Sequence, residues 1–277
     1  MDEIHRKYEE LKDVLRSMES VAVAYSGGVD STFLLKVAVD TLGPERVLGV
    51  IAVSESYPAR ELEEARSLAT GMGARIRIIE TEELSNPSYA RNPVDRCFHC
   101  KTELFTKMFP VAREEGLQQV LYGVNADDLG DFRPGIVAAK KMGARGPLQE
   151  VGLTKNEIRL LSRELGLATW DKPAYACLSS RIPYGQRITK EALLQVDAAE
   201  NFLHDLGFRQ VRVRHHDQIA RIELPREDFP KLFSNGAAEL VAAKLKGLGY
   251  QYVTLDLQGY RMGSLNEALS ATPSSNA

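Results

Sequence analysis

The chain has 277 residues, of which 44% are hydrophobic and 26% charged, with a formal net charge of -3 and a sequence pI of about 6.0. This size and composition are those of a globular protein with one large domain or a large and a small one. The net charge shows no overall basic footprint for nucleic acid. No apolar run is long enough to span a bilayer, and residues 1–18 have the pattern of a polar amphipathic helix, not of a signal peptide. We therefore expect a cytoplasmic protein without nucleic-acid or membrane partners.

Short apolar segments alternate with helical patterns along the first 170 residues. The segments with the β-branched composition of buried parallel strands are 21–25, 47–53, 75–79 and 119–123. The helices expected between and after them are one ending at Gly43, two over 58–72 and 100–115, and one from the Thr154–Glu157 capping box to Gly166. This alternation predicts a doubly wound parallel α/β domain.

The pattern changes after residue 170. The segment 170–187 contains two prolines and shows no periodicity, so it predicts a loop. A helix from Thr189 to Gly207 is expected next, followed by strands over 211–215, 219–224 and 250–257. The predicted organisation is a large domain over 1–170, an interdomain active-site loop over 171–187, a smaller α+β domain over 188–269 and a disordered tail over 270–277.

The six residues between the first strand and the first buried helix have the composition of an anion-binding loop. They are Ser26, Gly27, Gly28, Val29, Asp30 and Ser31. Unpaired N–H groups and the helix dipole favour an anion at a helix N-terminus, and glycines let the backbone approach it closely. Asp30 repels a phosphate by charge, so a bridging Mg²⁺ is the natural reason for it. The alternative is a tight, well-capped turn, which explains any two of these residues but not the whole string.

The three cysteines are candidates for metal binding or sulfur chemistry. Cys97 and Cys100 form a CxxC at the entry to a helix, and Cys177 lies in the interdomain loop. Their odd number argues against a disulfide framework. The open interpretations are small buried side chains, a zinc site with only His99 near as a fourth ligand, and an iron–sulfur cluster or reactive sulfur site.

Five motifs, in order along the chain, resemble those of the LarE family. They are SGGVDS at 26–31, GVNADDLGDFRPG at 123–135, ACLSSRIPYG at 176–185, VRVRHH at 211–216 and DLQGYRMGSLN at 256–266. The similarity covers nearly the whole chain, and the last four motifs are far more specific than the first. The first resembles the PP-loop of the N-type ATP pyrophosphatases, which cleave ATP between its α- and β-phosphates and adenylate a substrate.

The resemblance to the LarE family implies an activity, a fold and a set of cofactors. Its members are homo-oligomeric, ATP-dependent sulfur transferases for the nickel-pincer nucleotide cofactor. They activate the carboxylates of pyridinium-3,5-dicarboxylate mononucleotide with ATP and Mg²⁺ and convert them to thiocarboxylates. The implied fold is that of the adenine nucleotide alpha hydrolase-like, PP-loop superfamily.

The family supplies sulfur in two ways. In one, a lone cysteine at the position of Cys177 gives up its own sulfur and becomes dehydroalanine. In the other, a CxxC joins that cysteine to hold a [4Fe–4S] cluster whose open iron carries the sulfide. This chain has Cys97, Cys100 and Cys177 and so departs from the single-cysteine pattern. We expect the cluster, because it explains all three thiols, and keep the sacrificial cysteine as the alternative.

The resemblance also places a second anion site, for the phosphate of the mononucleotide substrate. Arg212 and Arg214 alternate along a strand and therefore share one face, and guanidinium groups bind phosphate bidentately. The alternative is a charged sheet face without a ligand. By resemblance, the residues around the phosphate are Ser180, Arg181, Glu200, Arg212 and Arg214.

Two further groups of polar residues carry weaker predictions. Asp128 follows a strand end, where α/β folds bind ligands, so it is predicted to hold Mg²⁺ or the edge of the substrate. The alternative is a capping aspartate at a solvated helix start. His215 and His216 are expected at the surface and not on a metal.

Three other functions compete with sulfur insertion into a small molecule. A tRNA thiolase shares the PP-loop but needs a basic surface or an RNA-binding domain, which the net charge and small C-terminal domain do not favour. An amide-forming synthetase needs an ammonia source and no cysteines. A non-catalytic nucleotide-binding or cluster-carrying protein would release no pyrophosphate when a carboxylate substrate is added.

Overall fold

The computed structural model describes residues 2–128, 134–173 and 176–266. The chain divides into two compact units. The first comprises the described residues within Met1–Tyr89 and Asp95–Tyr175, and the second those within Ala90–Val94 and Ala176–Ala277. The expected tail over 270–277 and residues 129–133 of the second motif lie outside the described residues.

The first unit is built on a four-stranded parallel sheet with the strand order β3-β2-β1-β4. Its strands are β1 (Val21–Ala24), β2 (Val47–Val53), β3 (Arg75–Glu80) and β4 (Gln119–Tyr122). All four lie where the sequence pattern predicts them. Because every strand runs in the same direction, all four carboxyl ends lie along one edge of the sheet, where such folds bind ligands.

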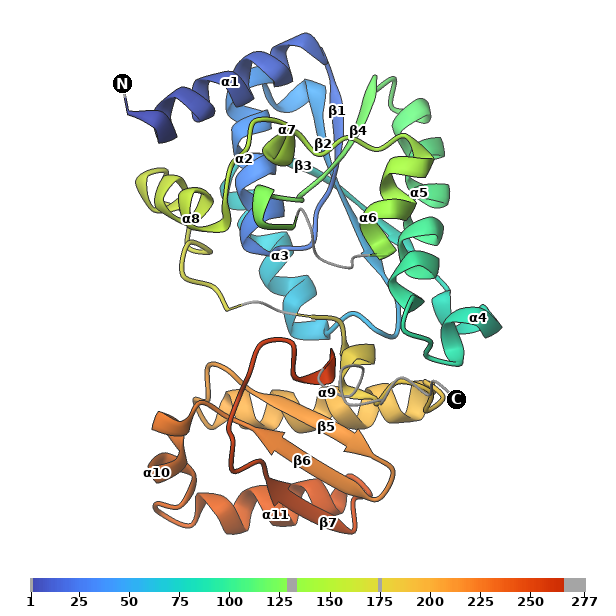
Figure 1. Ribbon diagram of the computed structural model, residues 1–277, viewed down its shortest axis with the longest axis vertical. Helices are drawn as coiled ribbons and strands as arrows, with labels where there is room; N and C mark the ends of the chain where they lie inside the picture. Colours follow the sequence, from blue (N-terminus) through green and yellow to red (C-terminus); the bar gives the residue numbers. More distant parts are fainter. Residues whose placement is uncertain (1, 129–133, 174–175, 267–277) are drawn as a thin grey trace, which may run out of the picture. The chain divides into compact units, whose positions relative to one another are not determined.

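Helices cover both faces of this sheet (Figure 1). They are α1 (Glu3–Ser17), α2 (Val29–Leu42), α3 (Ala59–Gly71), α5 (Arg96–Glu114), α6 (Pro134–Met142), the short α7 (Pro147–Glu150) and α8 (Lys155–Glu164). The four-residue helix α4 (Pro87–Ala90) comes just before α5 in the chain. Side chains of α1, α2, α3 and α8 share one core with Val21 and Val23, whereas those of α5 and α6 share another with Ala22. The result is the predicted doubly wound α/β architecture. None of the described helices is both long and apolar enough to cross a membrane.

Two helix starts show how local chemistry sets the fold around the candidate site. The predicted capping box is present at α8, where Thr154 and Glu157 each accept a backbone N–H of the other. In contrast, α5 begins at Arg96 and not at the expected Cys100, so both cysteines of the CxxC lie within its first two turns. The first residue of this helix that is buried is charged, namely Arg96. A search for apolar residues at helical spacing therefore does not detect the start of the helix.

The second unit is a three-stranded mixed sheet with two longer helices packed on one face (Figure 1). Its elements are α9 (Lys190–Asp205), β5 (Arg212–His216), β6 (Ile219–Glu223), α10 (Phe229–Leu232), α11 (Ala237–Gly247) and β7 (Tyr252–Leu255). Strand β5 is antiparallel to β6, and β6 is parallel to β7. Val213 and Ile222 point into the core with α9 and α11, so their neighbours in the sequence occupy the opposite face.

Short 3-10 turns complete the chain. They are η1 (Pro44–Arg46), η2 (Glu83–Ser85), η3 (Ala126–Asp128), η4 (Leu178–Arg181), η5 (Arg226–Asp228) and η6 (Ser264–Asn266). The turn η4 lies within the segment expected to be an irregular loop, and it begins directly after Cys177.

Residues 90–94 belong to the second unit although the sequence on either side of them belongs to the first. The Ala90 and Asn92 carbonyls accept the N–H groups of Ile188 and Gly185 at 2.8 and 3.0 Å. The fully buried Asn92 amide donates to the carbonyls of Ile182 and Pro183 at 3.1 and 2.7 Å. The sequence pattern does not predict that residues 90–94 belong to the second unit, because the contacts that place them there connect positions about ninety residues apart.

Candidate active site

The loop from Ser26 to Ser31 joins the carboxyl end of β1 to the N-terminus of α2. Gly28 is the N-cap of α2 and has no side chain to accept the first-turn N–H groups, which suits an anionic ligand. The hydroxyls of Ser26 and Ser31 lie 3.1 Å apart, and the Ser31 hydroxyl also accepts the Ser26 N–H at 3.2 Å. The sequence-predicted phosphate loop is thus held in a compact turn.

Glycine is required at two places around this loop. Gly27 has a φ of 69°, and a Cβ there would lie 2.9 Å from the Cβ of Ala65 on α3. A Cβ on Gly123, at the end of β4, would lie 2.9 Å from the Ser31 nitrogen. Backbone from α2, α3 and β4 therefore approaches at distances that side chains would prevent.

Asp30 does not stand alone as a magnesium candidate, because a lysine already holds its carboxylate. The ammonium of Lys155, in the first turn of α8, lies 2.9 Å from both Asp30 oxygens. The Asn125 amide lies 3.3 Å from one of them. Lys155 is 32% exposed, so it has room to move away from Asp30 when a cation or a phosphate arrives. Sequence reasoning missed this lysine, because nothing in a helix-capping segment marks its first residue as a site residue.

The acidic pair after β4 shapes its own loop. Asp128 accepts the Asn125 N–H at 3.0 Å, and Asp127 accepts the Lys155 N–H at 2.8 Å. Both contacts are those of capping aspartates, which is the alternative interpretation given above for Asp128. The catalytic role predicted for Asp128 stays a prediction.

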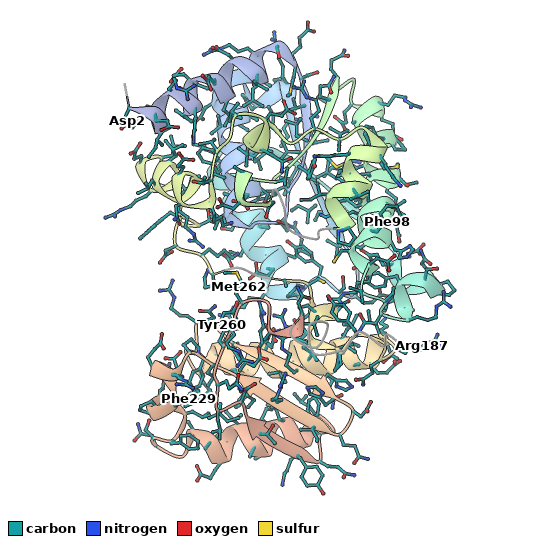
Figure 2. All side chains as sticks on the ribbon, viewed as in Figure 1. Asp2, Phe98, Arg187, Phe229, Tyr260 and Met262 are labelled. Carbon is teal, nitrogen blue, oxygen red and sulfur yellow. The ribbon has the colours of Figure 1, made fainter. Side chains whose placement is uncertain are left out.

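The three cysteines are accessible and are not core side chains. Cys97 and Cys177 are exposed, and Cys100 is half-buried. Phe98 lies between the first two on α5 (Figure 2), and the Cys100 thiol donates to Glu83 at 3.5 Å. Among the described residues, no three His, Cys, Asp or Glu side chains form a group that could hold a metal ion. Exposure argues against the interpretation of the thiols as small buried side chains.

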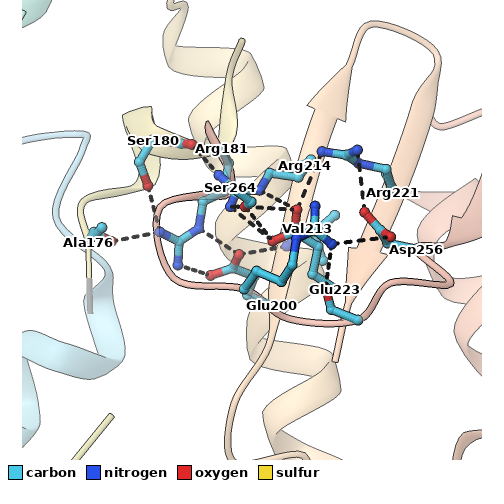
Figure 3. Close-up of polar contacts among 12 residues, drawn as sticks. Ala176, Ser180, Arg181, Glu200, Val213, Arg214, Arg221, Glu223, Asp256 and Ser264 are labelled. Atoms are coloured by element: carbon cyan, nitrogen blue, oxygen red, sulfur yellow. Dashed lines mark hydrogen bonds and ion pairs between the residues drawn. The ribbon is translucent and has the colours of Figure 1, made fainter. Parts of the chain in front are cut away.

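Two buried arginines of the second unit form a network with two buried glutamates (Figure 3). Arg181 makes two parallel bonds to Glu200, each 2.8 Å long, and Arg214 makes two to Glu223, each 2.9 Å long. All four side chains are at most 5% exposed. Glu200 also accepts the Val213 N–H at 2.8 Å, so its carboxylate orients Arg181 and the strand.

The same network fixes the segment that carries Cys177. Arg181 donates to the carbonyl of Ala176 and to the hydroxyl of Ser180, and Arg214 donates to the Ser180 carbonyl at 2.6 Å. The η6 residue Ser264 accepts from Arg214 at 2.7 Å. The structure therefore brings together four of the predicted phosphate residues, namely Ser180, Arg181, Glu200 and Arg214, and adds Glu223 and Ser264 to them.

Arg212 differs from the other two arginines of this cluster in its contacts. It shares a sheet face with Arg214, as predicted, but within the described residues no carboxylate lies at ion-pair distance from it; its guanidinium lies over the Tyr260 ring, 4.7 Å from the centroid. Burial is the main cause that lowers the pKa of Arg212, and the charges of Arg181 and Arg214 lower it further, against the opposing effects of Tyr260 and Glu223. With Arg221 and Asp256, which join the network at Glu223, four arginines face three carboxylates among the described residues, so the cluster has an excess of one positive charge there and favours a bound anion.

The two histidines at the end of β5 differ from the expectation that both lie at the surface. His215 is buried, with its Nδ1 3.1 Å from the Tyr250 hydroxyl, and His216 is half-buried. Burial is the main cause that lowers the pKa of each imidazole. The expectation was wrong for His215 because it packs against Tyr250, a residue that lies 35 positions later in the chain.

A parallel sheet with an SGGVDS loop between the carboxyl end of β1 and the N-terminus of α2 is characteristic of the ATP-using enzymes of the PP-loop superfamily, and this chain is one of them. A sequence profile described as NAD synthase matches residues 3–99, which contain this loop.

Comparison with whole proteins then gives the family. The pyridinium-3,5-bisthiocarboxylic acid mononucleotide synthase of Lactiplantibacillus plantarum is 41% identical over 259 residues, which are 92% of this chain and 92% of that protein. A Synechocystis protein, slr1717, is 45% identical over 267 residues, 96% of this chain and 99% of its own length. The chain belongs to the LarE family of the PP-loop superfamily.

Proposed function

We propose that this enzyme inserts sulfur into carboxyl groups of pyridinium-3,5-dicarboxylate mononucleotide, for the nickel-pincer nucleotide cofactor. The observation that carries the proposal is the arginine cluster, in which Arg212 has no carboxylate at ion-pair distance within the described part of the chain and Arg181 holds the backbone beside the exposed Cys177. A mononucleotide brings the anion that this cluster favours, and the thiol lies on the same segment. The related synthase has a mononucleotide and two thiocarboxylates in its name.

The first chemical step in this proposal is adenylation. The ATP phosphates bind the N–H groups and hydroxyls of the Ser26–Ser31 loop, where Gly28, the N-cap of α2, makes no side-chain cap hydrogen bond. A carboxylate oxygen of the substrate attacks the α-phosphorus, and the bond to pyrophosphate breaks. The donor chemistry fits Mg²⁺, since one carboxylate together with phosphate oxygens is a usual set of ligands; Asp30 would hold the ion once Lys155 moves away from it.

Sulfur then displaces AMP from the acyl carbon. Cys97, Cys100 and Cys177 would hold a [4Fe–4S] cluster, and their exposed or half-buried thiols suit thiolate ligation. Such a cluster would supply the sulfide. In the alternative, the Cys177 thiolate attacks the acyl carbon and AMP leaves; loss of the Cα proton then breaks the Cβ–S bond, leaving dehydroalanine and a thiocarboxylate.

Metal analysis and a pyrophosphate assay test these steps separately. Protein purified without oxygen should contain about four irons and four sulfides per chain and lose them in Cys97→Ala. A colourless protein that loses the mass of one H₂S at Cys177 after turnover would replace the cluster by the sacrificial cysteine. Pyrophosphate released with the mononucleotide and ATP, but not with tRNA and ATP, supports the substrate class. No release with either would contradict the proposed function.

A further inference from the structure

Lys172 is a buried cation that none of the steps above uses. Its side chain is 8% exposed, and its ammonium donates to Glu61 at 2.8 Å and lies 3.0 Å from Glu64, both on α3. It also donates to the carbonyl oxygen of Gly27 at 3.3 Å. An ammonium has three N–H groups, and these three acceptors lie around it.

The backbone of Lys172 is fixed as firmly as its ammonium. The Arg159 guanidinium, on α8, donates to the carbonyls of Trp170 and Lys172 at 2.6 and 2.7 Å. The Lys172 N–H donates to Thr169 at 3.0 Å. A lysine held in this way offers the Gly27 carbonyl a charge at a defined position.

Peptide geometry connects this contact to the phosphate loop. In a planar trans peptide the C=O and the following N–H point in opposite directions. The contact between Lys172 and the Gly27 carbonyl therefore directs the Gly28 N–H away from the ammonium. In the same way the Tyr57 hydroxyl, which donates to the Ser26 carbonyl at 3.0 Å, sets the direction of the Gly27 N–H.

We propose that Lys172 is a positioning residue of the ATP site, which aims the N–H groups of the loop at the nucleotide phosphates by holding the Gly27 carbonyl. This inference rests on the proposed ATP site. It assigns Glu61 the role of orienting the lysine and Tyr57 that of an uncharged second anchor. Lys172 does not contact the phosphate in this proposal, so its loss should raise the dissociation constant for Mg·ATP without removing a ligand of ATP.

The test is binding of Mg·ATP by calorimetry, beside urea unfolding of the same proteins. Lys172→Met alone leaves Glu61 buried without its partner and is expected to unfold more easily. The double variant Lys172→Met with Glu61→Gln removes both charges and should recover most of the stability. We expect it to bind Mg·ATP about ten- to hundred-fold more weakly than the wild type, as for the loss of a hydrogen bond from a charged donor.

A control and a conservative variant separate this role from a structural one. Lys36→Met removes another lysine, which pairs with Asp40 on α2 at 2.7 Å, and should leave the affinity for Mg·ATP unchanged. Lys172→Arg keeps the charge and should recover part of the affinity. If the double variant is stable and binds Mg·ATP like the wild type, Lys172 is not a positioning residue. If the wild type itself does not bind Mg·ATP, the proposed ATP site fails together with this inference.

Discussion

The two candidate anion sites of this protein are built in opposite ways. The loop from Ser26 to Ser31 offers backbone N–H groups at a helix N-terminus, in a turn that needs glycine. The site in the second unit offers guanidinium groups, two of which are held by buried glutamates. A backbone site depends on conformation, whereas a side-chain site depends on charge pairs. Substitutions should therefore damage the two sites through different physical quantities.

The largest effect is expected where a buried charge pair is broken. Glu223→Ala leaves Arg214, whose side chain is 2% exposed, without its carboxylate, and should lower the free energy of unfolding by about 3–5 kcal/mol. Urea denaturation measures this. The matched control is Glu150→Ala, which breaks the exposed two-bond pair with Arg145 and should cost about 1 kcal/mol or less. Equal losses in the two variants would contradict the buried network.

The backbone site should fail through strain and close contact. Gly27→Ala places a Cβ at a φ of 69° and 2.9 Å from Ala65, so it should cost about 1–3 kcal/mol of stability and lower the affinity for Mg·ATP at least about ten-fold. Gly73→Ala is the control, because Gly73 has a similar φ of 67° but open space around it. It should lose stability and keep its affinity. If Gly27→Ala binds Mg·ATP with the affinity of the wild type, the Ser26–Ser31 loop is not part of the ATP site.

Arg212 gives the sharpest contrast with its neighbours, since among the described residues it has no carboxylate partner. Arg212→Met removes a buried guanidinium and its contact with the Tyr260 ring, so it should lower the free energy of unfolding by about 1 kcal/mol, while it weakens binding of the mononucleotide by about ten-fold or more. Calorimetry and urea unfolding of the same sample give both numbers. A loss of stability as large as that in Glu223→Ala would show that Arg212 is a structural residue and not the anion's partner.

The smallest effect concerns His215, at the far end of the same strand. Burial lowers the pKa of the His215 imidazole, against an opposing effect of Asp217; Tyr250 is its other neighbour. Below a pH of about 6.5, the ordinary histidine value, the unfolded chain binds the proton more readily than the folded chain. Stability should therefore be full above that pH and fall as the pH decreases below it.

Unfolding measured between about pH 7.5 and 5 checks this sign. In His215→Gln the pH dependence should be shallower, by less than the roughly 1.4 kcal/mol per pH unit that one group can contribute. His5→Gln is the control, because hydrogen bonding to Asp2 raises the pKa of His5 and its removal acts in the opposite sense. An unchanged slope in His215→Gln would assign the effect to His216 or to other groups.

The sequence predicted what depends on local chemistry. The apolar run 47–53 coincides with β2, and the Thr154–Glu157 box opens α8 as expected, because both depend on neighbouring residues. The SGGVDS loop was found for the same reason. Lys155, Lys172 and Glu223 could not be found, since the contacts that give them a role connect positions up to 145 residues apart or on facing strands. A single charged residue in a loop or on a strand forms no sequence pattern, so its role can be predicted only when the position of its partner in the fold is known.

The excursion of residues 90–94 limits how this protein can be taken apart. Because these residues complete the second unit through Asn92, a gene cut at residue 175 would leave the first unit with a loop evolved for partners at 182–188. The segment from residue 176 onward, expressed alone, would in turn miss the Ala90 and Asn92 carbonyls, which bind Ile188 and Gly185. Neither half is an interchangeable module. Exchange of the second unit between relatives must therefore include residues 90–94 as well as the segment from residue 176 onward, so recombination at a single crossover cannot transfer the complete second unit.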